Sequence, residues 1–441
     1  MATDMTKGPV VRPLVRFTLP LVLANVFQLT YNAADAIIVG RFVGKEALAA
    51  VGAAGPVVNI ITFLVVGACL GAGVLMSEFF GAQDRETLRC EIGTSLTAGL
   101  AFTIALVLGC GLLAHPLLSL TRVPEDLLPS AALYLQIVCA ALPFTFLYNL
   151  FASALRAVGD SRTPLFFVAA SACANIIVDY VFVVVLDWGV QGAALATALA
   201  MTFSGVLCTG YVWFRIPLLR PGWSQLRPRS DLLHRTIGYS WVTAMQQAAL
   251  YIGKLLVQSC VNTLGVDTIA AFNAVNRVDD FAYTPQQNIA HAMTTFLAQN
   301  RGAGKKDRME QGFRAGALLE VVYWAALAVV VLLSARGIMS LFVDGDETVV
   351  DMGTSYLHWM ALLYLMPACT NWIQGYFRGL GDLKVTLIST SVQMLGRVSF
   401  TFLLAPHFGI EGIAFAQMGG WIVMLAYEVP VLLRTRRKMK A

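Results

Sequence analysis

The chain has 441 residues, of which 57% are hydrophobic and only 13% are charged, and its formal net charge is +5. A soluble protein carries about 25% charged residues, so this chain has too little polar surface for a soluble globule. The composition excludes soluble enzymes, nucleic-acid binders and disulfide-stapled secreted domains. Continuous rather than alternating apolar runs also exclude an outer-membrane barrel, and they indicate a helical membrane protein.

Twelve apolar runs follow one another along the chain, and each is long enough for a spanning helix of about 20 residues. They cover residues 13–38, 47–75, 91–113, 131–152, 163–186, 190–214, 236–262, 269–297, 314–335, 354–376, 385–404 and 409–433. Lysine and arginine resist translocation, and 24 of the 31 lie on one side of this arrangement. We therefore expect a multi-pass protein of the inner membrane with both termini in the cytoplasm.

The second half of the chain repeats the first. LRAVGDSR at 155–162 matches FRGLGDLK at 377–384, and GVQGAA at 189–194 matches GIEGIA at 409–414. Each repeat holds an even number of spans, so the two halves enter the membrane the same way round. We expect an all-α fold of two pseudo-symmetric six-helix lobes, at 1–214 and 236–441, joined by a cytoplasmic linker at 215–235.

Two acidic residues lie within apolar spans of the first half, Asp35 in the first span and Asp179 in the fifth. A carboxylate in hydrocarbon is costly, so each is a functional candidate. Asn175 lies one helical turn from Asp179, and Thr197 lies at a similar depth in the returning sixth span. Their oxygen atoms suit Na+, and paired buried acids also suit a proton.

Several motifs taken together resemble one family. They are Pro20 in the first span, Asp35 in NAADAIIVGRFVG, the LRAVGD and FRGLGD loops, and NIIVDYVFVVVLDWGVQGAALAT. The sequence resembles the multidrug and toxic compound extrusion (MATE) family of cation-coupled antiporters over nearly its whole length. The resemblance implies a V-shaped pair of six-helix lobes that exports cationic amphiphilic drugs by alternating access, driven by Na+ or H+.

The resemblance also assigns roles to single residues. It implies that the coupling cation, either Na+ or H+, binds at Asp35, Asn175, Asp179 and Thr197. It places Gln28 and Tyr134 in the substrate cavity. We expect that cavity to include Asn149, Gln246, Arg277 and Asp279 as well, and we expect Pro20 to act as a hinge because proline weakens a helix.

The second half lacks the acidic site, since Leu256, Arg397, Thr401 and Gln417 occupy the positions of Asp35, Asn175, Asp179 and Thr197. We therefore expect ion coupling in the first half alone. The second half instead holds five charged groups in or near its spans, at Lys254, Arg277, Asp279, Asp280 and Arg397. They form either an ion-pair cluster that stabilises the lobe or a polar surface that touches substrate.

Two other functions are alternatives to the antiporter. A flippase or exporter of a lipid-linked saccharide would need more cationic side chains facing its substrate. An intramembrane enzyme is disfavoured because the sequence has no HExxH, GxSxG or Walker A motif. We expect a secondary active transporter without a cofactor, a monomer whose partners are small-molecule substrates and the lipid bilayer, with no nucleic acid. The sequence leaves open the substrate range and the choice between Na+ and H+.

Overall fold

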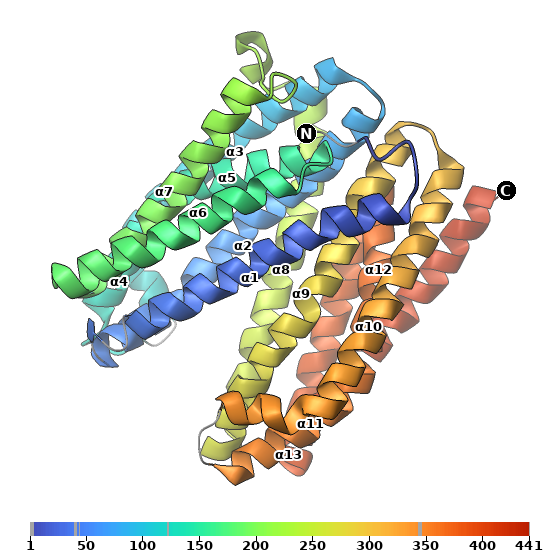
Figure 1. The fold of residues 1–441 in the computed structure, drawn as a ribbon. Coiled ribbons are helices and arrows are strands. Elements are labelled where there is room, and N and C mark those ends of the chain that lie inside the picture. Colours follow the sequence, from blue (N-terminus) through green and yellow to red (C-terminus); the bar gives the residue numbers. More distant parts are fainter. Residues whose placement is uncertain (1–3, 39–41, 44, 121–122, 343–345, 441) are drawn as a thin grey trace. The chain divides into compact units, whose positions relative to one another are not determined.

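The structure is a computed structural model that describes most of the chain (Figure 1). Residues 1–3, 39–41, 44, 121–122, 343–345 and 441 lie outside the described part, as do the side chains of 31–37, 45–48, 120 and 440. Every regular element in the described part is a helix.

The helices of the first repeat are long and follow the predicted spans closely. They are α1 (Val11–Ile38), α2 (Lys45–Gly81), α3 (Arg85–Leu120), α4 (Leu128–Ala140), α5 (Leu142–Ala157), α6 (Arg162–Asp179), the π-helical η2 (Tyr180–Val185) and α7 (Gly189–Arg215). A short 3-10 helix, η3 (Trp223–Leu226), lies in the segment that leads to the second repeat.

The second repeat has the same order of helices. It comprises α8 (Ser230–Val261), α9 (Val266–Gly302), α10 (Lys306–Phe342), α11 (Glu347–Leu363), α12 (Leu365–Leu380) and α13 (Leu383–Lys440). α13 contains the last two predicted spans. They meet at Gly409, where φ is 58° and the chain changes direction. Only glycine adopts such a backbone conformation without a steric penalty.

The fourth predicted span of each repeat is divided into two helices. α4 and α5 meet at an angle of 42°, and α11 and α12 divide the matching span of the second repeat. The breaks have a common cause, because Pro143 and Pro367 lie in the first turns of α5 and α12. Proline is tolerated there but removes a hydrogen bond from a helix interior.

Seven described helices are apolar and long enough to span a membrane, or eight if the bent pair α4–α5 is one span. α13 is counted once there although it contains two predicted spans. Three further predicted spans, α8, α9 and the pair α11–α12, are not apolar enough to be counted. They carry more polar side chains, such as Asp279 and Asp280 on α9. The pair α4–α5, the second span of α13 and these three polar spans together account for the difference between seven and twelve.

Contacts within the chain define two units. The first unit contains residues 1–5 and 19–244, and the second contains residues 6–18 and 245–441. α1 therefore begins in the second unit and continues in the first, whereas α8 begins in the first and ends in the second. The predicted limits of the lobes and of the linker remain a prediction.

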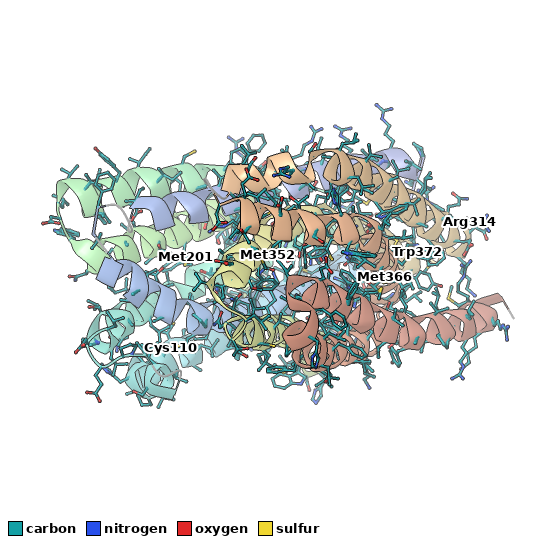
Figure 2. The ribbon with its side chains drawn as sticks, turned by 90° about the horizontal axis from the view of Figure 1, so that it is seen from below. Cys110, Met201, Arg314, Met352, Met366 and Trp372 are labelled. Atoms are coloured by element: carbon teal, nitrogen blue, oxygen red, sulfur yellow. The ribbon has the colours of Figure 1, made fainter. Side chains whose placement is uncertain are left out.

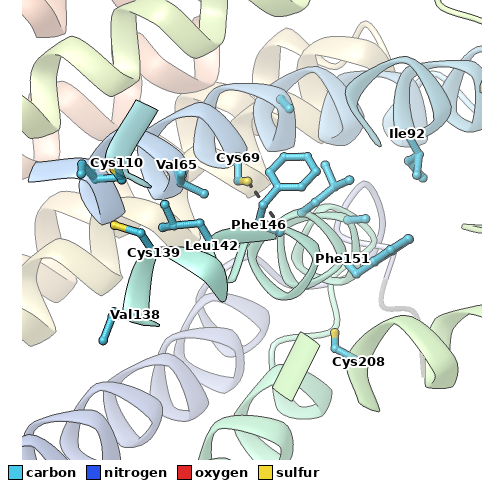
Figure 3. Packing of buried hydrophobic residues seen from close by; sticks show 14 of the residues in the cluster. Val65, Cys69, Ile92, Cys110, Val138, Cys139, Leu142, Phe146, Phe151 and Cys208 are labelled. Carbon is cyan, nitrogen blue, oxygen red and sulfur yellow. Dashed lines mark hydrogen bonds between the residues drawn. The ribbon is translucent and has the colours of Figure 1, made fainter. Parts of the chain in front are cut away.

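The core of the first unit lies where α2, α3, α4 and α5 meet (Figure 3). The thiol of Cys69 on α2 donates a hydrogen bond to the backbone oxygen of Phe146 on α5 at 3.9 Å. A Cβ atom at Gly99 on α3 would lie 2.0 Å from the ring of Phe146, so only glycine fits there. Because lipid is as apolar as leucine, such close packing of small residues holds membrane helices together.

Replacing Gly205 on α7 with alanine is expected to destabilise the first unit, whereas the same change at Gly210 is not. A Cβ atom at Gly205 would lie 2.4 Å from the backbone oxygen of Phe144 on α5. Overpacking of this kind costs about 1–3 kcal/mol. A Cβ atom at Gly210, on the same helix, would meet nothing within 4 Å. Thermal unfolding of both purified variants measures the difference, and equal midpoints would contradict the close packing of α5 against α7.

Candidate functional site

The two candidate cation ligands of the fifth predicted span lie buried inside the first unit. Asn175 is 1% exposed and Asp179 is 0% exposed. They lie one turn apart on α6, so they share a face of the helix. α6 packs against α7, the returning helix of the same repeat. The structure thus places a carboxylate and an amide together on one buried face.

Helix α6 changes its winding at Asp179. The next residues form the π-helical turn η2, in which the backbone N–H of Leu186 donates to the carbonyl of Val181 at 2.9 Å. The sequence of η2, YVFVVV, is rich in valine, which loses side-chain freedom in an α-helix. The matching segment of the second repeat, 402–407, is α-helical. π-helical turns are rare and are frequent at functional sites, so this turn agrees with the role expected of Asp179, which stays a prediction.

The amide of Asn175 has unused hydrogen-bonding capacity. Both its oxygen and its nitrogen are buried, and neither has a hydrogen-bond partner among the described residues. An unsatisfied buried polar group costs about 1–3 kcal/mol, so this amide is a candidate to bind a water molecule or an ion. Its oxygen and the carboxylate of Asp179 are donors that suit a hard cation such as Na+.

The other two predicted cation ligands are placed less completely. Asp35 lies on α1, but its side chain is outside the described residues. Thr197 lies half-buried on α7. No group of three His, Cys, Asp or Glu side chains suited to a metal ion occurs in the described part, and this search does not include the side chain of Asp35. The convergence of all four residues stays a prediction.

The predicted cavity residues of the first unit have different surroundings. Gln28 is exposed on α1, whereas Tyr134 on α4 is 8% exposed. Asn149 on α5 is half-buried, and its amide donates to the backbone oxygen of Thr145 at 2.8 Å within the same helix. Their contact with substrate remains a prediction.

Asp279 on α9 is bound by two tyrosines. It is 3% exposed, and it accepts hydrogen bonds from the hydroxyls of Tyr356 at 2.9 Å and Tyr364 at 2.6 Å. Arg397 on α13 is also buried and attracts this carboxylate electrostatically, but its Nε has no hydrogen-bond partner among the described residues. Tyr364 packs edge-on against Tyr283, with 5.5 Å between the ring centroids. Asp279 is therefore held in a buried polar network.

The remaining charges of the predicted cluster lie nearer the surface. Lys254 and Asp280 form a salt bridge of 3.0 Å, with each side chain about half exposed. Arg277 is exposed on α9. The five charged groups therefore divide into a surface pair and a separate buried network, in which two tyrosine hydroxyls as well as the charge of Arg397 stabilise Asp279. Contact of Arg277 and Asp279 with substrate remains a prediction.

Gln246 on α8 belongs to a second buried network. Its amide nitrogen donates to Gln374 Oε1 at 3.0 Å and to Thr390 Oγ1 at 2.9 Å. The guanidinium of Arg378 also donates to Gln374 Oε1, at 3.2 Å. These bonds tie α8, α12 and α13 together. Contact of Gln246 with substrate remains a prediction.

Three buried acids were missed by the sequence analysis. Glu91 is 0% exposed, Glu320 is 1% exposed and Glu428 is 0% exposed. Glu91 accepts a hydrogen bond from the hydroxyl of Thr236 at 2.8 Å. Glu320 on α10 has no hydrogen-bond partner for either oxygen among the described residues. Its position in an apolar span could have revealed it, and it is a second candidate for an ion-binding acid.

An internal repeat of apolar helices with buried acids is typical of an integral membrane transporter. The MatE family model matches residues 20–181 and 243–403. The chain therefore belongs to the MATE family, and its role is that of a transporter, not an enzyme.

Individual relatives agree with this assignment. The chain is 27% identical to a "Probable multidrug resistance protein YpnP" of Bacillus subtilis, over 93% of this chain and 92% of the relative. It is 22% identical to a "FAD transporter" of Shewanella oneidensis, over 89% and 88% of the two chains. The crystal structure of a MATE protein in the bent conformation matches with a TM-score of 0.90 and 22% identity, over 99% of this chain and 98% of that chain. This last likeness shows the fold.

The hydrogen bond between Tyr364 and Asp279 is expected to contribute measurably to stability. Tyr364→Phe should lower the free energy of unfolding by about 1–3 kcal/mol, because the carboxylate loses a charge-assisted partner. In an Asp279→Asn background the same substitution should cost less. Tyr427→Phe is the control, since Tyr427 is half-buried and makes no hydrogen bond with a described residue. Denaturant unfolding of the wild type and the three variants of the cycle measures this coupling, and an equal cost of Tyr364→Phe in both backgrounds would contradict it.

Proposed function

We propose that this protein is a cation-coupled antiporter that exports cationic amphiphilic drugs and other toxic small molecules by alternating access. The observation that carries the proposal is the buried pair Asn175 and Asp179, placed where α6 turns into a π-helix. The name of the Bacillus subtilis relative supports a role in multidrug resistance. The name of the Shewanella oneidensis relative indicates that the family also includes transporters of other compounds.

The coupling step follows from the charge of the two acids. When Asp35 and Asp179 are both ionised, they repel each other in a low-dielectric region, and a bound Na+ or proton removes that repulsion. The amide of Asn175 contributes a neutral oxygen to the proposed site, and its charge stays the same whether or not the acids are ionised. Thr197 completes the proposed ligand set from α7.

Pro20 is the proposed hinge of α1. It lies inside the helix, two residues beyond Thr18, where α1 passes from the second contact unit to the first. Proline removes one backbone hydrogen bond and clashes with the preceding turn, so α1 can bend there at low cost. Neutralisation of Asp35, which lies on the same helix, would then shift the balance between the straight and the bent conformation of α1.

The flippase alternative is less well supported by the second unit. A pyrophosphate headgroup needs several free cations. Lys254 is neutralised by Asp280, and Arg397 is buried beside Asp279. Of the three cations Lys254, Arg277 and Arg397, Arg277 is the one that is exposed without an ion pair among the described residues.

The proposed setting is the cytoplasmic membrane, with both termini in the cytoplasm, on the evidence of the lysine and arginine distribution. We propose a monomer that needs no cofactor besides the coupling ion, which is Na+ or H+.

Asp179→Asn is expected to lower concentrative drug transport by about tenfold or more, because an amide can accept hydrogen bonds but cannot change its charge. Reconstituted protein in liposomes, with a fluorescent cation and an imposed Na+ or pH gradient, measures this transport. Asp280→Asn is the matched control, since Asp280 forms a half-exposed salt bridge, and it should keep the ion dependence of the wild type.

Two results would contradict this assignment. Asp179→Asn could still concentrate the substrate against a gradient, in which case its carboxylate has no part in coupling. Alternatively, Glu320→Gln could abolish the ion dependence while Asp179→Asn leaves it intact, which would move the coupling site to α10 of the second unit.

A further inference from the structure

The beginning of the chain is fixed onto the second unit by two cationic side chains. Lys305 donates to the backbone oxygen of Thr6 at 2.8 Å, and Arg308 donates to that of Gly8 at 2.8 Å. Both cations lie at the junction of α9 and α10. They hold the first turns of α1 beside α10, within the second unit.

A groove of about 1010 Å³ lies between these two helices. Its lining residues are Pro9, Val10, Val11, Arg12, Val15, Arg16, Gln311, Arg314, Ala315 and Leu318. Val11 is 43% exposed, Val15 is 46% exposed and Leu318 is 56% exposed. In a chain that spans a membrane, an apolar surface of this kind is suited to contact with lipid.

The groove also carries an excess of positive charge. Arg12 and Arg16 are exposed, and neither makes a hydrogen bond or ion pair with a described residue. Arg314 lies on the outside of α10 (Figure 2) and contacts Glu310 at 2.9 Å. Arg436 binds the same carboxylate at 2.6 Å, so one negative charge serves two arginines.

The first unit fills the corresponding groove with protein. Gly93 and Thr97 of α3 match Arg314 and Leu318 of α10 in the repeat. A Cβ atom at Gly93 would lie 2.1 Å from the backbone oxygen of Gln225, and the hydroxyl of Thr97 donates to the backbone oxygen of Leu226 at 2.7 Å. The segment around η3 therefore covers this stripe of α3. No described segment of the chain covers the stripe on α10 in the same way.

We propose that an anionic phospholipid occupies the groove between α1 and α10. Its phosphate binds Arg12 and Arg16, with Arg314 at the facing edge. Its acyl chain lies over Val11, Val15 and Leu318. The charge of the groove is complementary to an anionic group and its apolar lining to a hydrocarbon chain, and a phospholipid such as phosphatidylglycerol supplies both.

Native mass spectrometry of the purified full-length protein tests this site. The wild type is expected to retain phosphatidylglycerol in preference to phosphatidylcholine. The double variant Arg12→Gln/Arg16→Gln should lose that preference, by about fivefold for each arginine. The double variant Arg162→Gln/Arg227→Gln removes two exposed arginines of the first unit, and it should bind both lipids as the wild type does.

A second variant separates the lipid from a free anion. Leu318→Trp keeps the arginines but fills the apolar groove, so it should lower the retention of phosphatidylglycerol. Millimolar inorganic phosphate should fail to displace the lipid. Unfolding midpoints equal to that of the wild type show that the variants are folded.

Three results would overturn the proposal. The first is equal retention of the two lipids by the wild type. The second is an unchanged preference in folded Arg12→Gln/Arg16→Gln. The third is displacement of the lipid by inorganic phosphate, which would indicate a site for simple anions.

Discussion

Polar groups buried in hydrocarbon must find their partners within the protein, because the bilayer offers none. Asp279 meets this constraint through two tyrosine hydroxyls, and Gln246 meets it through Gln374 and Thr390. Asn175 does not, because neither polar atom of its amide has a partner among the described residues. A transporter needs some polar groups that are free to exchange partners, and this amide adjoins Asp179, the acid that we propose for coupling.

The two repeats use similar helices for different purposes. Each divides its fourth span near a proline, at Pro143 and at Pro367. The fifth span of the first repeat then ends in the π-helical turn η2, whereas the matching segment of α13 is α-helical. Polar residues differ between the repeats as well, since Arg397 replaces Asn175. The fold is therefore duplicated, but the proposed ion site is not.

The sequence predicted the features that depend on hydropathy and repetition, and it missed those that depend on contacts. Apolar runs placed the long helices but not the breaks within the two fourth spans or the short helix η3. The spacing of Asn175 and Asp179 placed them on one face of α6. The π-helical turn could not be foreseen, because a run of valines in a membrane span is usual in ordinary helices. The tyrosine partners of Asp279 lie far from it in the chain, so charge pairing with lysine or arginine was the natural but incomplete expectation. Glu320 was overlooked although its apolar surroundings made it visible.

In an antiporter the substrate and the coupling ion exclude each other, and we propose that this competition acts through Asp179. In a reciprocal coupling, each ligand lowers the affinity for the other by the same factor. The most direct measurement mixes a cationic drug with purified protein in weakly buffered solution and records released protons with a pH dye, or released radioactive sodium after preloading. The account predicts release from the wild type and none from Asp179→Asn. Drug binding to the wild type without release of either ion would contradict it.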